Sequence, residues 1–168
     1  MNAVMAKHAR FSIVPFIWLL IAGCTTQLAP NYDKALVAGL TSVNSEVMAL
    51  FASVSAGTKP DSFPQREQKY NAVIGALDAL AIQAAARPIP KSSATEAVNK
   101  ALKNRGVAPL SDDEIPSATA LRKISATVVK MRDTDKKQGV TAYEAQAFKN
   151  QATIYMDQAL TYESYLER

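Results

Sequence analysis

The chain contains one cysteine, one histidine and one tryptophan, and all three lie near its N-terminus, at Cys24, His8 and Trp18. Residues 25–168 therefore hold no thiol and no imidazole. This absence excludes disulfides within that part of the chain, a Ser-His-Asp triad, a Cys-His pair, a zinc site with histidine ligands and the Glu-x-x-His motif of di-iron bundles. The folded part must be held together by packing, and the sequence indicates no cofactor and no metal.

A large excess of positive charge is also absent. The chain has 19 Lys and Arg residues against 15 Asp and Glu residues, a net charge of +4. Lys7 and Arg10 belong to the first ten residues, and removing these two from 19 leaves 17 basic residues and a net charge of +2. So small an excess is not the electrostatic footprint of a nucleic-acid-binding protein, so we expect no nucleic acid as a partner.

The N-terminus has a basic stretch followed by an apolar one. Residues 1–10 contain Lys7 and Arg10 and no acidic residue, whereas residues 11–23 are almost wholly apolar. These 13 apolar residues are too few to span a bilayer as a helix, which takes about 20, and their number is typical of an export signal. The alternative is an uncleaved signal anchor in which Cys24 is incidental.

The apolar stretch ends in Leu20-Ile21-Ala22-Gly23-Cys24, which resembles the lipobox of bacterial lipoproteins. In that family an aliphatic residue and two small residues precede a cysteine. The resemblance implies that signal peptidase II recognises Ile21, Ala22 and Gly23 and removes residues 1–23. It also implies that Cys24 carries acyl chains, which bind membrane lipid and, when there are several, hold a protein stably.

The residue after the cysteine bears on the location. In many Gram-negative lipoproteins an aspartate at this position favours retention in the inner membrane, and this chain has Thr25. For a Gram-negative source the resemblance therefore implies the outer membrane, with the domain facing the periplasm. Residues 24–30 are predicted to be a lipidated tether, and residues 31–168 a folded domain. Because the six residues 25–30 reach at most about 20 Å, the domain should lie close to the bilayer.

Four segments repeat apolar residues at alternating spacings of three and four, as one face of an amphipathic helix does. The predicted helices are residues 31–56, 63–86, 117–137 and 141 to the C-terminus. Their apolar seams are Leu36, Leu40, Val43, Val47, Leu50 and Val54; Phe63, Tyr70, Val73, Leu77, Leu80 and Ala84; Leu121, Ile124, Val128 and Met131; and Phe148, Ala152, Tyr155, Ala159, Tyr162 and Leu166. No stretch alternates with a period of two. The predicted fold class is therefore all-α, an antiparallel four-helix bundle.

Capping residues give the expected ends of these helices. The predicted N-caps are Asn31, Ser62 paired with Gln65, and Thr141 paired with Glu144, and the predicted stops are Gly57 and Gly139. Residues 135–137, of which the last two are lysines, are expected to end the third helix in polar chain.

The connection over residues 87–116 is long for a bundle and is expected to contain a short crossover helix at 94–104. The basic residues of this helix suggest a solvated face, or contact with anionic lipid headgroups. An acidic cluster follows at Ser111-Asp112-Asp113-Glu114. Such carboxylates can bind Ca²⁺ or act in acid–base chemistry, but Ser111 with Glu114 also fits a capping box, which is the favoured interpretation.

Three functions remain open on the sequence. The first is a membrane-anchored, non-enzymatic interaction or structural module whose partner is an envelope protein. The second is an assembly factor like the pilotins, small helical lipoproteins that bring a secretion-channel subunit to the outer membrane. The third is a small hydrolase or ligand-binding protein that uses Asp, Glu or Tyr side chains. Asp78 and Asp157 flank the seams and are not expected to be buried, and the tyrosines of the last helix are expected to pack rather than to line a ligand groove.

Overall fold

The structure is a computed structural model that describes residues 29–89, 100, 101, 103, 104 and 114–167. The lipobox with Cys24, most of the predicted crossover helix and Ser111 lie outside the described residues. Within the predicted crossover helix, the four described residues are helical.

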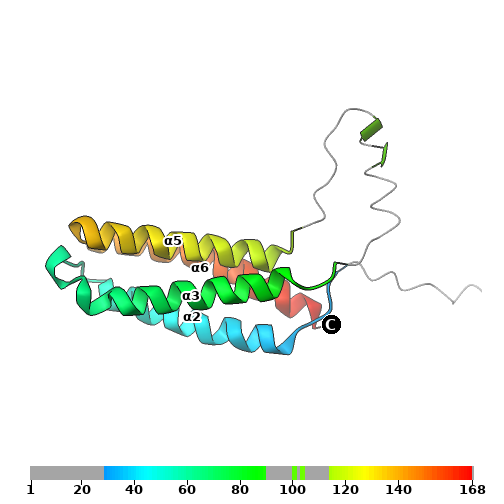
Figure 1. The fold of residues 1–168 in the computed structure, drawn as a ribbon, viewed down its shortest axis with the longest axis horizontal. Helices are drawn as coiled ribbons and strands as arrows, with labels where there is room; N and C mark the ends of the chain where they lie inside the picture. The colour runs from blue at the N-terminus through cyan, green and yellow to red at the C-terminus, as the bar shows by residue number, and fades with distance from the viewer. Residues whose placement is uncertain (1–28, 90–99, 102, 105–113, 168) are drawn as a thin grey trace, which may run out of the picture.

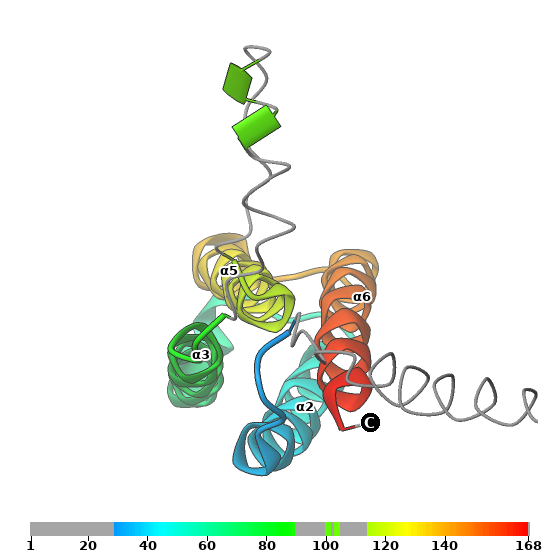
Figure 2. The same cartoon turned by 90° about the vertical axis from the view of Figure 1, so that its right-hand side faces the viewer.

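Four long helices build the domain: α2 (Lys34–Val54), α3 (Pro64–Ala85), α5 (Pro116–Gln138) and α6 (Ala142–Leu166). A 3₁₀ turn, η1 (Pro60–Ser62), precedes α3. Successive helices run in opposite directions along the long axis (Figure 1). The view along the bundle in Figure 2 shows the four helices around a common interior. α5 packs on α3 and α6, and α2 closes the bundle against the same two helices. The predicted all-α bundle is confirmed.

The interior is filled by the predicted seams of α2, α3 and α5. Every seam residue of α2 and α5 is buried, and Phe51 and Ala81 join them. Of the predicted α3 seam, Leu80 alone is only partly buried, and it lies against Gly39 of α2. α2 is long and apolar enough to cross a membrane by length and composition. A third of this apolar window is buried, and it forms the continuous apolar face with which the helix closes the bundle.

The buried line of α6 is rotated slightly from the predicted seam. Ala152 and Ala159 are buried as expected, but Met156 takes the central position. Tyr155 and Tyr162 are only partly buried at the margin of the core. Small alanines at the centre let α6 approach its neighbours closely, so that the larger rings are placed at the edge. Tyr155 and Tyr162 therefore pack at the edge of the core, whereas Tyr143 and Tyr165 are exposed.

Several helix ends follow the prediction. Thr141 and Glu144 form a reciprocal capping box at the start of α6. The backbone turns at Gly57 and Gly139, with φ angles of 87° and 78°. These are left-handed conformations, which glycine adopts without steric cost.

Three helix starts differ from the prediction. Asp33, not Asn31, caps α2, because its carboxylate accepts hydrogen bonds from the backbone N–H groups of Ala35 and Leu36 at 2.9 and 3.1 Å. Ser62 does not cap α3, because it belongs to η1 and its hydroxyl donates to the carbonyl of Lys59.

The third difference concerns α5. This helix begins at Pro116 with Ile115 at the N-cap position and no side-chain cap. Glu114 lies ahead of the helix and pairs with the exposed Arg122 at 2.9 Å. A capping box ending at Glu114 would start a helix several residues earlier, so Glu114 does not have that role in α5.

Candidate functional site

The predicted site residues Ile21, Ala22, Gly23 and Cys24 lie outside the described residues, but the chain that follows them is held against one end of the bundle. Pro30 is buried. The carbonyl of Asn31 accepts a hydrogen bond from Arg87 at 3.4 Å, and the carboxylate of Asp33 accepts one from Gln83 at 3.3 Å. Both donors belong to the C-terminal part of α3 and the residues after it. The chain is thus fixed to the bundle before α2 begins. We call this end of the bundle, where residues 29–33 and the end of α6 lie, the tether end.

A buried ion pair lies at the tether end. The guanidinium of Arg87 donates from Nη2 and Nη1 to the two carboxylate oxygens of Glu163 at 2.5 and 2.8 Å. The Glu163 side chain is fully buried, and that of Arg87 is 9% exposed. A two-point contact of this kind fixes the relative orientation of both groups. It joins the end of α3 to the last turn of α6.

Ser117 completes this network from the first turn of α5. Its hydroxyl donates to Glu163 and accepts from Arg87, and the side chain is fully buried. A serine beside a carboxylate can suggest a nucleophile, but the described residues enclose this hydroxyl, which already donates its proton to Glu163. The arrangement therefore links elements. Through Arg87 it connects α3, α5, α6 and the residues before α2.

A second buried network lies at the opposite end, which we call the hairpin end because the α2–α3 and α5–α6 connections meet there. Asp135, near the end of α5, is fully buried and receives 2.9 Å hydrogen bonds from Nε and Nη2 of Arg66. The hydroxyls of Thr58 and Tyr70 also donate to it. Every buried polar side-chain atom of the described residues has a partner. The carboxylate therefore has no free position for a ligand.

The contacts of this network shift the pKa values of the Asp135 carboxyl and the Tyr70 phenol. Burial by itself would raise the pKa of Asp135, but the hydrogen bonds and charge of Arg66, with the Thr58 and Tyr70 hydroxyls, hold it below its ordinary value. Burial and the adjacent carboxylate raise the pKa of the Tyr70 phenol well above its ordinary value. At neutral pH the network therefore consists of a charged Arg66–Asp135 pair and a protonated phenol.

The two connections at the hairpin end are hydrogen-bonded to each other. The backbone N–H of Thr58 donates to the carbonyl of Val140, and the N–H of Val140 donates to the Thr58 hydroxyl, both at 2.8 Å. A Cβ atom on Gly139 would come within 2.4 Å of the Thr58 carbonyl oxygen. Only glycine permits this approach. We call this contact between the two connections the backbone clasp.

Sequence reasoning missed both buried acids. It placed Asp135 in the polar end of the third helix, which is wrong, and it gave Glu163 no role. The helical spacing was the signal that could have predicted the burial of both acids. Asp135 follows Met131 by four residues, and Glu163 follows Ala159 by four, so each continues the buried line of its helix. An acid on such a line predicts a buried partner, because an unpaired buried charge is too costly.

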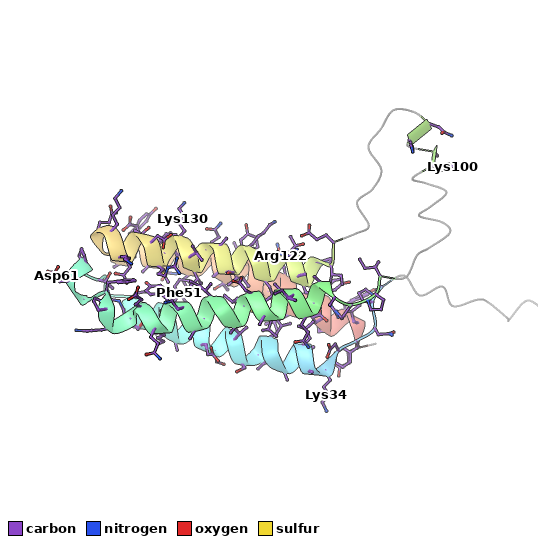
Figure 3. The ribbon with its side chains drawn as sticks, in the orientation of Figure 1. Lys34, Phe51, Asp61, Lys100, Arg122 and Lys130 are labelled. Carbon is purple, nitrogen blue, oxygen red and sulfur yellow. The ribbon has the colours of Figure 1, made fainter. Side chains whose placement is uncertain are left out.

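The exposed positions match the prediction better. Asp78 and Asp157 are both exposed. Asp78 lines an open cleft of about 670 Å³ on the outer side of α5, where Arg122 and Lys130 project (Figure 3). A second cleft, of about 780 Å³, lies beside the backbone clasp and is lined by residues such as Asp61 and Gln65. Among the described residues, no three His, Cys, Asp or Glu side chains converge to hold a metal.

Comparison with protein-family models, curated proteins and solved structures finds no match to the chain.

Proposed function

We propose that this chain is a lipoprotein, anchored in a membrane through acylated Cys24, that acts as a non-enzymatic interaction or structural module of the cell envelope. For a Gram-negative source the membrane is the outer membrane, and the domain faces the periplasm. The observation that carries the proposal is the position of the tether. Six residues after Cys24, the chain reaches Pro30, which is buried. Six residues extend at most about 20 Å. The tether end of the bundle thus stays near the lipid-bearing residue.

The buried polar groups favour a structural over a catalytic role. Asp135 and Glu163 are fully buried and hydrogen-bonded to arginines on neighbouring elements. A general acid or base must be able to reach a substrate proton, and neither carboxylate is accessible. Conversely, the acids that flank the seams, Asp78 and Asp157, are solvated. These features support binding through the surface of the bundle rather than chemistry within it.

The pilotin-like alternative calls for an apolar groove that accepts a peptide. The two clefts described on this surface are instead lined mostly by charged, hydroxyl and amide side chains. No specific observation favours the assembly-factor function. The broader proposal therefore places partner binding on the outer helix faces.

The anchor can be tested by Cys24→Ala. Cells would be fed a fatty acid that carries a chemical handle, and the protein would then be isolated from membrane and soluble fractions. We expect the wild-type chain to carry the label and to remain in the membrane fraction. The variant should carry no label and should leave the membrane fraction or accumulate unprocessed.

A matched control moves the thiol by two positions. In Cys24→Ala with Thr26→Cys the cysteine is no longer preceded by an aliphatic residue and two small residues, so lipidation should not return. If Cys24→Ala stays in the membrane at the wild-type level, the lipoprotein proposal is wrong. Crosslinking in intact cells, with Cys24→Ala as control, then tests the interaction module. A single envelope protein captured in near-equal amount with wild type would support it, whereas capture of abundant bystanders alone would contradict it.

A further inference from the structure

More than half of the basic residues of the four long helices belong to α5. This helix has six basic and two acidic residues, whereas α6 has one and three, α3 has two and two, and α2 has one and one. One of the two acids of α5, Asp135, is buried against Arg66 of α3 and adds no charge to the surface. Positive charge is therefore concentrated on one helix of the bundle.

Three lysines of α5 form a straight row. Lys123, Lys130 and Lys137 are exposed and follow one another at intervals of seven residues. Seven residues fall about 20° short of two full helical turns, so the three Cα positions lie almost in line over roughly 21 Å. Figure 3 shows Lys130 projecting from the outer side of α5. We call these three residues the lysine row.

No carboxylate of the described residues forms an ion pair with the lysine row. Lys123 lies over the ring of Tyr155, 5.3 Å from its centroid, and keeps its charge in this contact. Asp78 and Asp133 line the open cleft beside the row, but Asp133 binds Arg132 at 3.0 Å. The row therefore presents an excess of positive charge to solvent.

The chain that carries the proposed anchor enters the bundle beside the start of α5. Arg87 donates hydrogen bonds to the carbonyl of Asn31 and to the hydroxyl of Ser117, in the first turn of α5, at 3.4 and 3.2 Å. Pro30, six residues after Cys24, is buried at this end. Because six residues extend at most about 20 Å, the lipid-bearing residue stays close to the start of α5. A bilayer that holds the anchor is thus within reach of the outer side of this helix.

We propose that the lysine row docks on anionic phospholipid headgroups of this bilayer, with α5 lying along the membrane surface. The inference rests on the proposed function, because acylated Cys24 keeps the row near the headgroups. Each lysine near an anionic bilayer strengthens binding roughly fivefold. Three of them favour the docked orientation by on the order of 100-fold.

The chemistry of the row favours a lipid surface over a protein partner. An ammonium group on a flexible stem adapts to mobile headgroups, whereas a fixed carboxylate is recognised best by the planar fork of an arginine. Arg122 is already paired with Glu114. The exposed large apolar side chains of the described residues lie on α3 and α6, so α5 lacks the apolar anchors of a protein interface.

Docking through α5 turns α2 away from the membrane. Each of these two helices packs on α3 and α6 but not on the other, and Figure 2 shows them at opposite corners of the bundle. The only charged residues of α2 are Lys34 and Glu46. The helix with the least charge thus lies farthest from the anionic headgroups.

Two fluorescent probes test this orientation. The chain is purified from membranes in detergent and added to preformed vesicles that carry an energy acceptor on their headgroups. The vesicles consist of phosphatidylcholine, alone or with about one third phosphatidylglycerol. Ala126→Cys places a probe on the outer side of α5, and Ser45→Cys places one on the exposed face of α2. Because Cys24 is acylated in the mature chain, each added thiol is the only free one.

In vesicles with phosphatidylglycerol, energy transfer from the Ala126 probe should exceed transfer from the Ser45 probe. The difference should be smaller in phosphatidylcholine alone. It should also shrink in about 1 M salt, where the Debye length is about 3 Å.

Replacing the lysine row should remove the difference between the probes. The row variant carries Lys123→Gln, Lys130→Gln and Lys137→Gln. Its ratio of docked to undocked protein should fall by about 100-fold. The matched control carries three substitutions of exposed lysines outside the row, Lys34→Gln, Lys69→Gln and Lys149→Gln. It loses the same charge and should keep the difference. Both variants should give the circular dichroism of wild type, since the replaced side chains are exposed.

Equal transfer from the two probes in phosphatidylglycerol vesicles would overturn the proposal, as would equal losses in the row variant and its control. If the row variant keeps its orientation on the membrane but loses an acidic protein that wild type captures in cells, the row binds that protein and the proposal is wrong. Mass spectrometry of Cys24 reports the anchor separately. Acylated protein whose probes do not respond overturns the docking alone. If Cys24 carries no acyl chain, the anchor is wrong, and the same probes in a Cys24→Ala chain test the row by itself.

Discussion

The two ends of the bundle each contain a buried carboxylate paired with an arginine, yet they join the chain in different ways. At the hairpin end two short connections meet in the backbone clasp, and the Arg66–Asp135 network lies beneath it. At the tether end the residues before α2, the end of α3, the start of α5 and the end of α6 come together (Figure 1). There, side chains make the links, and Arg87 alone contacts groups from three other parts of the chain.

The difference shows how a bundle closes an end that has no short connections. Short connections limit how far helix ends can separate, and backbone hydrogen bonds between two of them add to this. Where a connection is long, that restraint is weak. A bidentate ion pair with further hydrogen bonds can replace it, because its planar geometry holds three elements in one arrangement.

The largest expected effect comes from removing one acid of a buried pair. Asp135→Ala should lower the free energy of unfolding by about 3–5 kcal/mol, because it leaves Arg66 without its partner and Tyr70 without an acceptor. Glu163→Ala should have a somewhat smaller effect, since Glu163 accepts three hydrogen bonds and Asp135 accepts four. Urea unfolding followed by circular dichroism measures both.

A double substitution tests whether the unpaired charge causes this loss of stability. In Arg87→Met with Glu163→Leu both charges are replaced by apolar groups of similar size, so much of the loss in Glu163→Ala should be recovered. If the double variant is less stable than Glu163→Ala, the cost does not come from the unpaired charge.

The next effect tests the backbone clasp. Gly139→Ala should lower the free energy of unfolding by about 1–3 kcal/mol, because the residue has a φ of 78° and the new methyl group would meet the backbone of Thr58. Gly75→Ala is the control in α3. No atom lies within 4 Å of a Cβ placed there, so this variant should be more stable than wild type by about 0.5–1 kcal/mol. Equal effects of the two alanines would show that the clasp imposes no restraint.

The smallest effect is the pH dependence of the hairpin end. The pKa of Asp135 in the folded state lies below its ordinary value of 3.8, so the unfolded chain binds the proton more tightly. The contribution of the charged form is therefore complete above about pH 5 and is lost as the pH falls through the unfolded pKa toward the folded pKa.

The measurement is the difference in unfolding free energy between wild type and Asp135→Asn as a function of pH. It should be constant from pH 7 to about pH 5 and should shrink in more acidic solution. The pKa values of Asp33 and Glu144 are also lowered, by hydrogen bonds from backbone N–H groups, and the comparison removes their contributions because both proteins retain them. A difference that grows toward low pH would contradict the assignment.

The fold was predictable because apolar spacing is local information. The seam from Leu36 to Val54 and the capping box of Thr141 depend only on residues within a few turns. From these patterns the positions of the four long helices and the antiparallel bundle were predicted correctly. The exposed state of Asp78 and Asp157 followed from the same rule.

The buried networks were not predictable in that way. Arg66 and Asp135 are 69 residues apart, and Arg87 and Glu163 are 76 apart, so no local pattern links them. A rule that treats every charge as surface placed Asp135 outside the core. The cap of α2 was missed for a smaller reason. Asn31 and Asp33 are both good caps, and the backbone conformation at residue 33 decides between them.

The hydrogen bond from Arg87 to the carbonyl of Asn31 has a mechanical consequence. A pull on the chain ahead of Pro30 enters the domain just before α2. Together with the hydrogen bond from Gln83 to Asp33, the bond from Arg87 passes part of this load to α3 and, through Glu163 and Ser117, to α6 and α5. The domain then resists the pull in shear across several helices instead of losing one helix at a time.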